Sequence, residues 1–465
     1  MLAKVEPIGS ESLDATRART SARDINEPAS QRSNLPIASR WLGFLANGPG
    51  FIRDVLTLTL GTAAAQSFTV LAAPVLTRIC SPAAIGQLAL FTSFMSVAAV
   101  AVSLKYELGI VSAPNALDAA RLTYAAAILS GPVSVIGGIV FYGAIRYSWM
   151  GFGGLPTYAP FLMVAVLLLT GVFTAFRYWA IRHNQFGLIS RTTVGQHSVR
   201  ALAQVGLGMA SGAGGLMVGE LLGRAVGVAP LLRSAWPKIR ECARHASVED
   251  FLQVLTHNRK LVTYSLPSTL IDTVVANLPI PIIIKLYGLE AGGYFAIVQK
   301  VLSAPLGLIS ASVADTFHSK LARYSRESPD DMRGLFRVTS VWLLGIGLVP
   351  ALMLALFGRA IMSLMFGNRW AVAGTLAALS TPWLLTQFIV SPLSRIVFVL
   401  RGQEWKLIYD AVILLTMLIV TFVAMRYRWS LLDTVWAFSL SNALAYIVYY
   451  LVLMQIVSRS ASQKV

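Results

Sequence analysis

The sequence predicts an all-α integral membrane protein with about twelve transmembrane helices in two pseudo-symmetric lobes of six. The chain is 56% hydrophobic and only 13% charged, with a mean hydropathy of +0.66, whereas soluble proteins average about 25% charged residues. Continuous apolar runs follow one another along the chain, each near the roughly 20 residues that cross the hydrocarbon core. Such runs exclude a β-barrel, whose strands are shorter and alternate between apolar and polar residues. Each membrane-spanning segment must therefore make its backbone hydrogen bonds within itself, as a helix.

A stretch near the start of the predicted bundle recurs in the second half of the chain. Residues 73–96 align with residues 280–303, and a basic residue, Arg78 or Lys285, stands in the same turn of each copy. The identical pairs are Pro74/Pro281, Ala84/Ala291, Gly86/Gly293, Ala89/Ala296 and Ser96/Ser303. Chance agreement among apolar residues is the alternative, but a duplicated unit predicts two related lobes with the substrate site at their interface.

Apolar runs of helical length define the two lobes. In the N-lobe (54–232) they are approximately Val55–Leu76, Gln87–Ser103, Leu122–Ile145, Tyr158–Ala175, Thr192–Met209 and Leu216–Leu232. In the C-lobe (261–456) they are approximately Leu261–Ile284, Gly293–Val313, Val338–Phe357, Ala373–Leu400, Leu407–Ala424 and Leu432–Ile456. A basic cytoplasmic linker, 233–260, joins the lobes, and residues 1–53 and 457–465 are predicted as cytoplasmic tails. The first tail is polar and has no apolar period, so we expect it to be disordered.

The net charge of +17 is unevenly distributed along the chain. With the amino terminus in the cytoplasm, most of the 38 Lys and Arg fall in tails and loops on that side, as the positive-inside rule requires. The even number of runs then places both termini in the cytoplasm. In this topology Cys80 and Cys242 lie on opposite faces of the membrane, where they cannot form a disulfide or share a metal ion. The basic excess therefore reflects membrane orientation and does not indicate nucleic acid as a partner.

The sequence offers no catalytic constellation. Its five His are scattered, and it contains neither a Gly-rich phosphate loop nor a metal-ligand motif. The outer loops are short, whereas membrane glycan polymerases usually carry a large outer loop for their chemistry. We therefore expect a protein that is not an enzyme and binds no cofactor or metal, with a membrane glycan polymerase as the alternative.

The fifth run carries a polar stripe. Its polar residues recur at three and four positions, on one helical face, and are Thr193, Gln196, His197, Arg200 and Gln204. Such a face indicates that the helix lines a water-filled cavity, or that its start lies at the lipid headgroups and Arg200 reaches outward. On the first interpretation, His197, Arg200 and Gln204 are candidate substrate-binding residues.

Lys300 and Asp272 are two of the charged residues within the predicted helices of the C-lobe. An ionised Lys near the bilayer centre costs about 2.5–3.5 kcal/mol, so we expect Lys300 to face the interior, with snorkelling as the alternative. Asp272 lies in a run interrupted by prolines. It could pair with a base, carry a coupling proton, help to hold a cation, or form a neutral hydrogen bond between helices. In the N-lobe, Gln66 belongs to the corresponding polar group and is a further candidate substrate-binding residue.

The sixth run combines a glycine series with a charged pair. Its every-fourth-residue glycines are Gly215, Gly219, Gly223 and Gly227. Small residues at this spacing predict the close approach of a neighbouring helix and imply no chemistry. Glu220 and Arg224 stand four apart and predict an i, i+4 ion pair. Arg224 is a further substrate-binding candidate, or a positive-inside anchor, and Glu220 is a second coupling-ion candidate after Asp272.

Five stretches carry a resemblance to a known family. They are VLTRICSPAAIGQLALF (75–91), LKYELGIV (104–111), RYWAIR (177–182), MFGNRWAVAG (365–374) and SPLSR (391–395). Together, in this order and at these separations, they resemble the polysaccharide flippases of the Wzx type. That family belongs to the superfamily that also contains multidrug exporters and the lipid II flippase. The resemblance covers about residues 54–456.

The resemblance implies two six-helix lobes around a central cavity that opens alternately to the two sides. It implies a flippase that moves an oligosaccharide repeat unit on undecaprenyl pyrophosphate across a bacterial inner membrane. The lipid-linked glycan and the surrounding membrane lipids would be its partners. Arg200 and Lys300, with Arg224, would attract the pyrophosphate or an acidic sugar. A gradient of H⁺ or Na⁺ would drive uphill transport through Asp272 or Glu220. An association with polymerase and chain-length proteins remains open.

Two alternatives come from the same superfamily. A multidrug exporter should line its cavity with acids and aromatics for cationic drugs, whereas the charged residues proposed here to bind the substrate, Arg200, Arg224 and Lys300, are basic. A lipid II flippase is closer, but those proteins often have more than twelve helices. The sequence leaves open the sugar composition, the coupling ion, the polysaccharide pathway and the oligomeric state.

Overall fold

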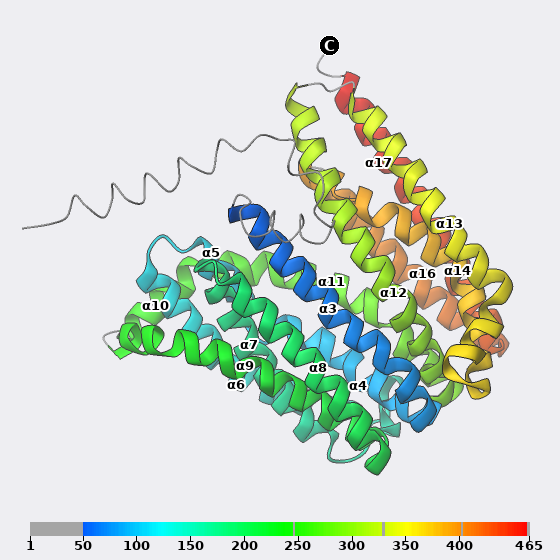
Figure 1. Ribbon diagram of the computed structural model, residues 1–465, viewed down its shortest axis with the longest axis horizontal. Helices are drawn as coiled ribbons and strands as arrows, with labels where there is room; N and C mark the ends of the chain where they lie inside the picture. Colours follow the sequence, from blue (N-terminus) through cyan, green and yellow to red (C-terminus); the bar gives the residue numbers. More distant parts are fainter. Residues whose placement is uncertain (1–49, 245–246, 328–330, 401–402, 463–465) are drawn as a thin grey trace, which may run out of the picture. The chain divides into compact units, whose positions relative to one another are not determined.

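The computed structural model describes residues 50–244, 247–327, 331–400 and 403–462 of the chain. Within these residues the regular structure is helical throughout, as the sequence predicts (Figure 1). Residues 57–465 form one compact unit, and the candidate site lies within it. Of the tail predicted to be disordered, residues 1–49 lie outside the described residues, whereas the first helix already begins at Gly50.

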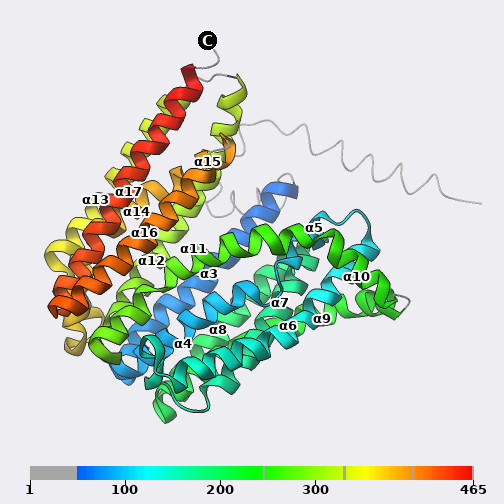
Figure 2. The same cartoon turned by 180° about the vertical axis from the view of Figure 1, so that it is seen from behind.

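The first half of the chain forms the N-lobe, drawn in blue to green in Figures 1 and 2. Its elements are α3 (Gly50–Ile79), α4 (Pro82–Ala101), α5 (Tyr106–Ser112), α6 (Ala116–Arg146), η2 (Trp149–Gly154), α7 (Ala159–Arg182), α8 (Phe186–Ser211) and α9 (Ala213–Arg244). The Ser81 side chain accepts a hydrogen bond from the Ala84 amide, and Pro82 occupies the first turn, where its missing N–H costs nothing. These residues therefore fix the start of α4.

The C-lobe follows after the linker. Its elements are η3 (Leu261–Ser265), α11 (Leu266–Asn277), α12 (Pro279–Glu327), α13 (Asp331–Phe366), η4 (Asn368–Trp370), α14 (Ala371–Leu393), α15 (Ile396–Val399), α16 (Gln403–Tyr427) and α17 (Leu431–Ser462). Helix α14 packs against α12, α13 and α17 and so forms the centre of the lobe. Helix α17 continues into the predicted carboxy-terminal tail, whose residues 463–465 lie outside the described residues.

Ten segments of the described chain are long and apolar enough to cross a membrane. Two features reconcile this number with the twelve predicted runs. The segment Leu261–Leu302 is 42 residues long, about twice the length of one crossing, and a break at Gly288 (φ 86°) interrupts its helix. Helix α8 has 26 residues and spans about 39 Å at 1.5 Å per residue, but its polar stripe lowers its hydropathy.

The segment expected as the basic linker, 233–260, is largely helical. Helix α9 extends into it, and a short helix, α10 (Val248–His257), follows. A capping box starts α10, because the Ser247 hydroxyl accepts from the Asp250 amide and the Asp250 carboxylate accepts from the Ser247 amide. Asp250 also pairs with Arg121 of α6 at 3.0 Å. The hydrogen bonds from Ser247 and the charge of Arg121 lower the pKa of Asp250, so the pair persists at neutral pH.

The lobes meet where α4 crosses α12, at a glycine pair from the sequence repeat. A Cβ atom on Gly86 would lie 2.0 Å from the Leu289 carbonyl oxygen, and one on Gly293 would lie 1.9 Å from the Pro82 carbonyl oxygen. The two contacts are equivalent, because Pro82 aligns with Leu289 in the repeat. Glycine permits this approach of two backbones. The two copies of the repeat therefore contact each other pseudo-symmetrically where the lobes meet.

The glycine series of α9 faces α8. Cβ atoms on Gly215, Gly219 and Gly223 would lie 2.0 Å from the Leu207 oxygen, 2.6 Å from Gln204 Cγ and 2.6 Å from Arg200 Cβ, respectively. The prediction that these glycines admit a neighbouring helix is confirmed. This packing brings the polar face of α8 against the charged pair of α9.

A buried tryptophan forms a further link between the lobes. The indole of Trp370 is fully buried, and its Nε1 donates to the Thr77 carbonyl oxygen of α3 at 2.8 Å. Trp370→Phe should leave that carbonyl unpaired, at a cost of about 1–3 kcal/mol, and lower the thermal unfolding midpoint of the purified protein. Trp342→Phe, at an exposed position of α13, is the matched control and should not change the midpoint. Equal midpoints for the two variants would contradict this role of the indole.

Candidate functional site

A cavity of about 410 Å³, here called the central cavity, lies between the lobes. Helices α3, α4, α8 and α9 form its N-lobe wall, and α12 forms its C-lobe wall. Its polar side chains belong to Thr92, Ser96, Arg200, Gln204, Glu220, Arg224, Gln299 and Lys300. Three of these residues are basic and one is acidic. Since apolar residues make up the rest of the lining, water screens these charges less than it would in bulk solution.

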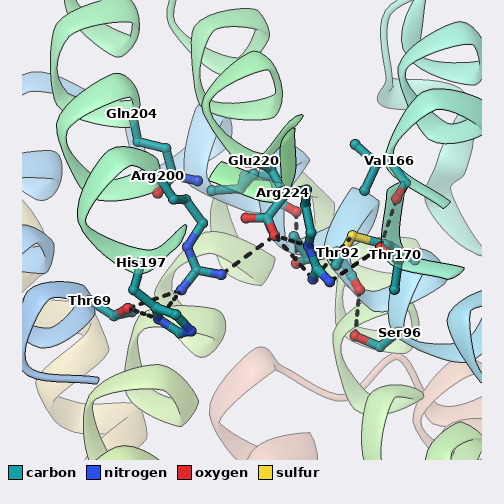
Figure 3. Close-up of polar contacts among 12 residues, drawn as sticks. Thr69, Thr92, Ser96, Val166, Thr170, His197, Arg200, Gln204, Glu220 and Arg224 are labelled. Atoms are coloured by element: carbon teal, nitrogen blue, oxygen red, sulfur yellow. Dashed lines mark hydrogen bonds and ion pairs between the residues drawn. The ribbon is translucent and has the colours of Figure 1, made fainter. Parts of the chain in front are cut away.

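Glu220 joins the two arginines of the cavity (Figure 3). Its side chain is 4% exposed, and its Oε1 lies 3.5 Å from Arg200 Nη1 and 3.3 Å from Arg224 Nη2. The contact with Arg224 is the i, i+4 pair that the spacing predicts, whereas the contact with Arg200 joins α9 to α8. Because a buried carboxylate requires compensating positive charge, Glu220 fixes both guanidinium groups at the cavity wall.

Further hydrogen bonds orient the arginines (Figure 3). Arg200 Nη2 donates to Thr69 Oγ1 at 3.0 Å and lies 2.9 Å from His197 Nδ1. A guanidinium can only donate, so His197 Nδ1 is the acceptor and the ring is neutral. Arg224 Nη1 donates to Thr170 Oγ1 at 3.2 Å. Arg200 is therefore held by partners on α3 and α9, and Arg224 by Thr170 on α7 and the sulfur of Met95 on α4.

Lys300 is the remaining cation of the central cavity. It lies on α12 beside Ala296, Ile297 and Gln299, which line the same cavity. Among the described residues, Lys300 makes no hydrogen bond and no ion pair. An unpaired ammonium that is partly removed from water is costly. An anion entering the cavity could therefore pair with Lys300 without displacing an existing hydrogen bond, whereas the arginines already share Glu220.

The other predicted binding residues take different places. Gln204 is buried, lines the cavity and donates to a backbone carbonyl of α9 at 3.3 Å. His197 is not part of the cavity lining and supports Arg200 from behind. Gln66, on α3, is likewise outside the lining, and within the described residues its Oε1 has no hydrogen-bond partner. Some residues of the predicted polar stripe therefore line the cavity, whereas His197 lies behind the lining and contacts Arg200.

Asp272 lies in a second cavity, also of about 410 Å³, which α11, α14, α16 and α17 enclose and which we call the C-lobe cavity. Its Oδ1 accepts a hydrogen bond from Lys406 Nζ at 2.9 Å, and the same ammonium lies 2.7 Å from the carboxylate of Asp410. Asp410 is buried, whereas Asp272 is exposed. The two coupling-ion candidates, Asp272 and Glu220, therefore occupy different cavities.

Sequence reasoning missed Lys406 and Asp410. Lys406 directly precedes the eleventh apolar run and resembles an ordinary loop residue. The available signal is the carboxyl group of Asp410 inside an otherwise apolar run, with a basic residue four positions before it. The partnership with Asp272 has no signal in the sequence, because the two helices are far apart along the chain.

Within the described residues, neither cavity has a cluster of metal-ligating side chains or a thiol in its lining. Among the residues that the structure describes, no three His, Cys, Asp or Glu side chains gather as possible metal ligands. Cys80 is a free thiol buried between α3 and α4. Burial raises the pKa of the Cys80 thiol, so its thiolate forms less readily than that of an exposed cysteine.

The chain is similar to known membrane transporters. A family model described as "Polysaccharide biosynthesis protein" matches residues 75–374, and none of the curated proteins matches the chain. A MOP superfamily transporter from Pyrococcus furiosus Vc1, described as having a binding pocket of reverse polarity, has a TM-score of 0.60 at 14% identity, over 90% of this chain and 98% of that chain.

Two further solved structures have similar folds. The lipid II flippase MurJ in an inward closed conformation has a TM-score of 0.64 at 14% identity, over 87% of this chain and 90% of that chain. A multidrug resistance MATE family transporter in an inward-facing conformation has a TM-score of 0.56 at 15% identity, over 86% and 96%. At these identities the likeness shows a shared fold.

Proposed function

Because the chain belongs to the polysaccharide biosynthesis protein family, we propose that it is a flippase for polyprenyl-pyrophosphate-linked oligosaccharide repeat units. It is a multi-pass membrane protein with the fold of known transporters. The observation that carries the proposal is the basic excess of the central cavity, where Arg200, Arg224 and Lys300 face a single carboxylate. This excess favours an anionic head group over a cationic drug. The proposed action is translocation without a catalytic step.

The proposed mechanism is alternating access. The head group enters the central cavity while the polyprenyl chain stays in the lipid. Pyrophosphate oxygens bind Lys300 and accept charge-assisted hydrogen bonds from Arg200 and Arg224. Rocking of the lobes separates α4 from α12 at their outer ends and exposes the cavity to the other side.

We place the protein in a bacterial inner membrane with both termini in the cytoplasm, following the positive-inside rule. In this orientation the contact at Gly86 and the Trp370–Thr77 hydrogen bond lie near the outer ends of their helices. Both support a conformation that is closed to the outside and ready to receive substrate from the cytoplasm.

We propose Glu220 as the first candidate for the coupling site. A pyrophosphate and the Glu220 carboxylate compete for the same two guanidinium groups. A proton on Glu220 would release Arg200 and Arg224 to the substrate, which links proton binding to substrate binding. Asp272 is already held by Lys406 in the C-lobe cavity, so we place it second. Coupling to Na⁺ through Asp272 remains the alternative.

Arg200→Ala and Lys300→Ala should each abolish polysaccharide export while the protein remains at its normal level in the membrane. Either change removes a cation that the proposed pyrophosphate site requires. The measurement is surface polysaccharide, together with the leaflet location of the lipid-linked repeat unit, in a strain that lacks the native gene and carries the variant. Repeat units should accumulate on the cytoplasmic side.

Two exposed basic residues provide matched controls. Arg191→Ala, on α8, and Lys320→Ala, on α12, should support normal export. Full export by both cavity variants would contradict the binding assignment. If deletion of the gene leaves the polymer normal but raises sensitivity to cationic dyes, the protein is a multidrug exporter. Accumulation of lipid II in that strain would identify a lipid II flippase.

A further inference from the structure

The C-lobe cavity has an aromatic wall. The ring-bearing residues that line it are Trp383, Tyr409, Tyr446 and Tyr449. Tyr409 stacks on Tyr449 with ring centroids 4.3 Å apart, and its centroid lies 5.2 Å from that of Tyr446. The three tyrosines come from two neighbouring helices, α16 and α17. Their mutual packing makes a preformed apolar surface inside a polar cavity.

The same cavity presents many hydrogen-bonding groups. Besides the cluster of Lys406 with Asp272 and Asp410, the amides of Gln387 and Asn442 line it. The hydroxyl of Tyr449 is buried and, within the described part of the chain, has no hydrogen-bond partner. A buried hydroxyl without a partner costs free energy that a ligand hydroxyl could recover. The cavity therefore suits a ligand with several donors and acceptors.

The charges of the C-lobe cavity balance one another. Lys406 and Arg395 offset Asp272 and Asp410, whereas the central cavity has a basic excess. A balanced cavity favours a neutral polar ligand over a phosphate. Sugars fit this description, because their hydroxyls bond to carboxylates and amides while their C–H faces pack on aromatic rings. The volume of about 410 Å³ lies within the range of about 300–1,000 Å³ that is usual for small-molecule sites.

Residues that are close together along the chain line the two cavities. Ala276 lines the C-lobe cavity and Ile280 lines the central cavity, one helical turn or about 6 Å further on. A smaller cavity of about 180 Å³ shares Gln387 and Ser391 with the C-lobe cavity and contacts α12 at Leu306, about 9 Å along the helix from Lys300. A ligand that is bound at Lys300 could therefore extend into the C-lobe cavity.

We propose that the C-lobe cavity binds sugar residues of the lipid-linked glycan while the central cavity binds its pyrophosphate. This inference rests on the proposed flippase function and assigns the two chemical halves of the substrate to different cavities. The aromatic wall supplies stacking, and the ion cluster with the two amides supplies hydrogen bonds. Selectivity for the glycan then resides in α14, α16 and α17, and affinity for pyrophosphate resides in α8, α9 and α12.

Binding of two lipids to the purified full-length protein in nanodiscs tests this division. One is undecaprenyl pyrophosphate, and the other is the lipid-linked repeat unit extracted from the native host. Tyr446→Leu removes a ring from the wall and should weaken binding of the glycan-bearing lipid at least ten-fold, with binding of undecaprenyl pyrophosphate unchanged. Lys300→Ala should weaken both. Tyr446→Phe keeps the ring and should retain most of the affinity.

Tyr450→Leu is the matched control. Tyr450 follows on α17 but packs against Phe336, with ring centroids 5.1 Å apart, and is not part of the C-lobe cavity. The Tyr450→Leu variant should bind both lipids as the wild type does. If Tyr446→Leu does not fold, Gln387→Leu, which removes one amide at similar volume, should give the same selective loss.

The outcomes separate the two proposals. If the wild type binds neither lipid, the proposed flippase function fails. If it binds both lipids with equal affinity, or if Tyr446→Leu and Gln387→Leu weaken both lipids equally or neither, the sugar assignment fails. In that case weaker binding of both lipids by Lys300→Ala would still support the pyrophosphate site in the central cavity.

Discussion

Gly86→Ala and Gly293→Ala are each expected to separate the lobes and to abolish export. The new methyl group would lie 2.0 Å or 1.9 Å from a backbone carbonyl oxygen of the opposite lobe. A helix backbone cannot rotate away as a side chain can, so α4 and α12 must move apart by more than an ångström. Overpacking of a tight contact costs about 1–3 kcal/mol, and a backbone obstacle places these variants near the upper end of that range. The thermal unfolding midpoint of each purified variant and its export of polysaccharide measure the effect.

Two other helical glycines provide the control. Cβ atoms on Gly131 and Gly143, both in α6, would meet nothing within 4 Å. Alanine is favoured over glycine inside a helix by about 0.5–1 kcal/mol. Gly131→Ala and Gly143→Ala should therefore keep or raise the midpoint and preserve export. If Gly86→Ala and Gly293→Ala behave like these controls, the glycine contact does not hold the lobes together.

Glu220→Ala should be the most destabilising change within the central cavity. The Glu220 side chain is 4% exposed, and its carboxylate is the shared partner of Arg200 and Arg224. Removing one partner of a buried ion pair typically costs about 3–5 kcal/mol, because the remaining charges lose their compensation. The thermal unfolding midpoint should fall accordingly. Glu241→Ala, at an exposed position of the same helix, is the control and should have little effect.

A triple variant distinguishes stability from function. Replacing a whole buried ion cluster by apolar residues of similar size is often neutral. Arg200→Met and Arg224→Met combined with Glu220→Leu should therefore recover much of the midpoint lost in Glu220→Ala, yet support no export because two cations of the proposed site are gone. A triple variant that exports normally would show that the arginines do not bind the substrate. A midpoint for Glu220→Ala equal to that of Glu241→Ala would contradict the buried cluster itself.

The sequence could predict those parts of the site that depend on spacing within one helix. Glu220 and Arg224 are four residues apart, which places them on one face in any α-helix, and their ion pair is present. The glycine series of α9 likewise predicts a face for a neighbouring helix, and α8 occupies it. The repeat predicted related lobes, although nothing in it indicated that Gly86 and Gly293 would lie at the crossing of α4 and α12.

The partners between helices could not be predicted. Hydropathy treats Asp272 as a lone carboxyl group, whereas the rotation of α11 against α16 brings it to Lys406. The stripe on α8 suggested one wet face, but His197 and Arg200 turn toward Thr69 of α3, and only some of its members reach the cavity. Such contacts depend on how far each helix is rotated about its axis, which no local pattern encodes.

By itself, the sequence determined the membrane helices, the two-lobe repeat and the residues that are costly to bury. A helix satisfies its own backbone, so hydropathy and residue spacing are sufficient for those features. The tertiary structure alone decided which costly residues meet: Glu220 pairs with Arg200 of another helix, Lys406 pairs with Asp272, and Lys300 has no hydrogen bond or ion pair among the described residues. Packing between helices makes these choices, because side chains distant along the chain interact only when the helices that carry them have been brought together and fixed in rotation.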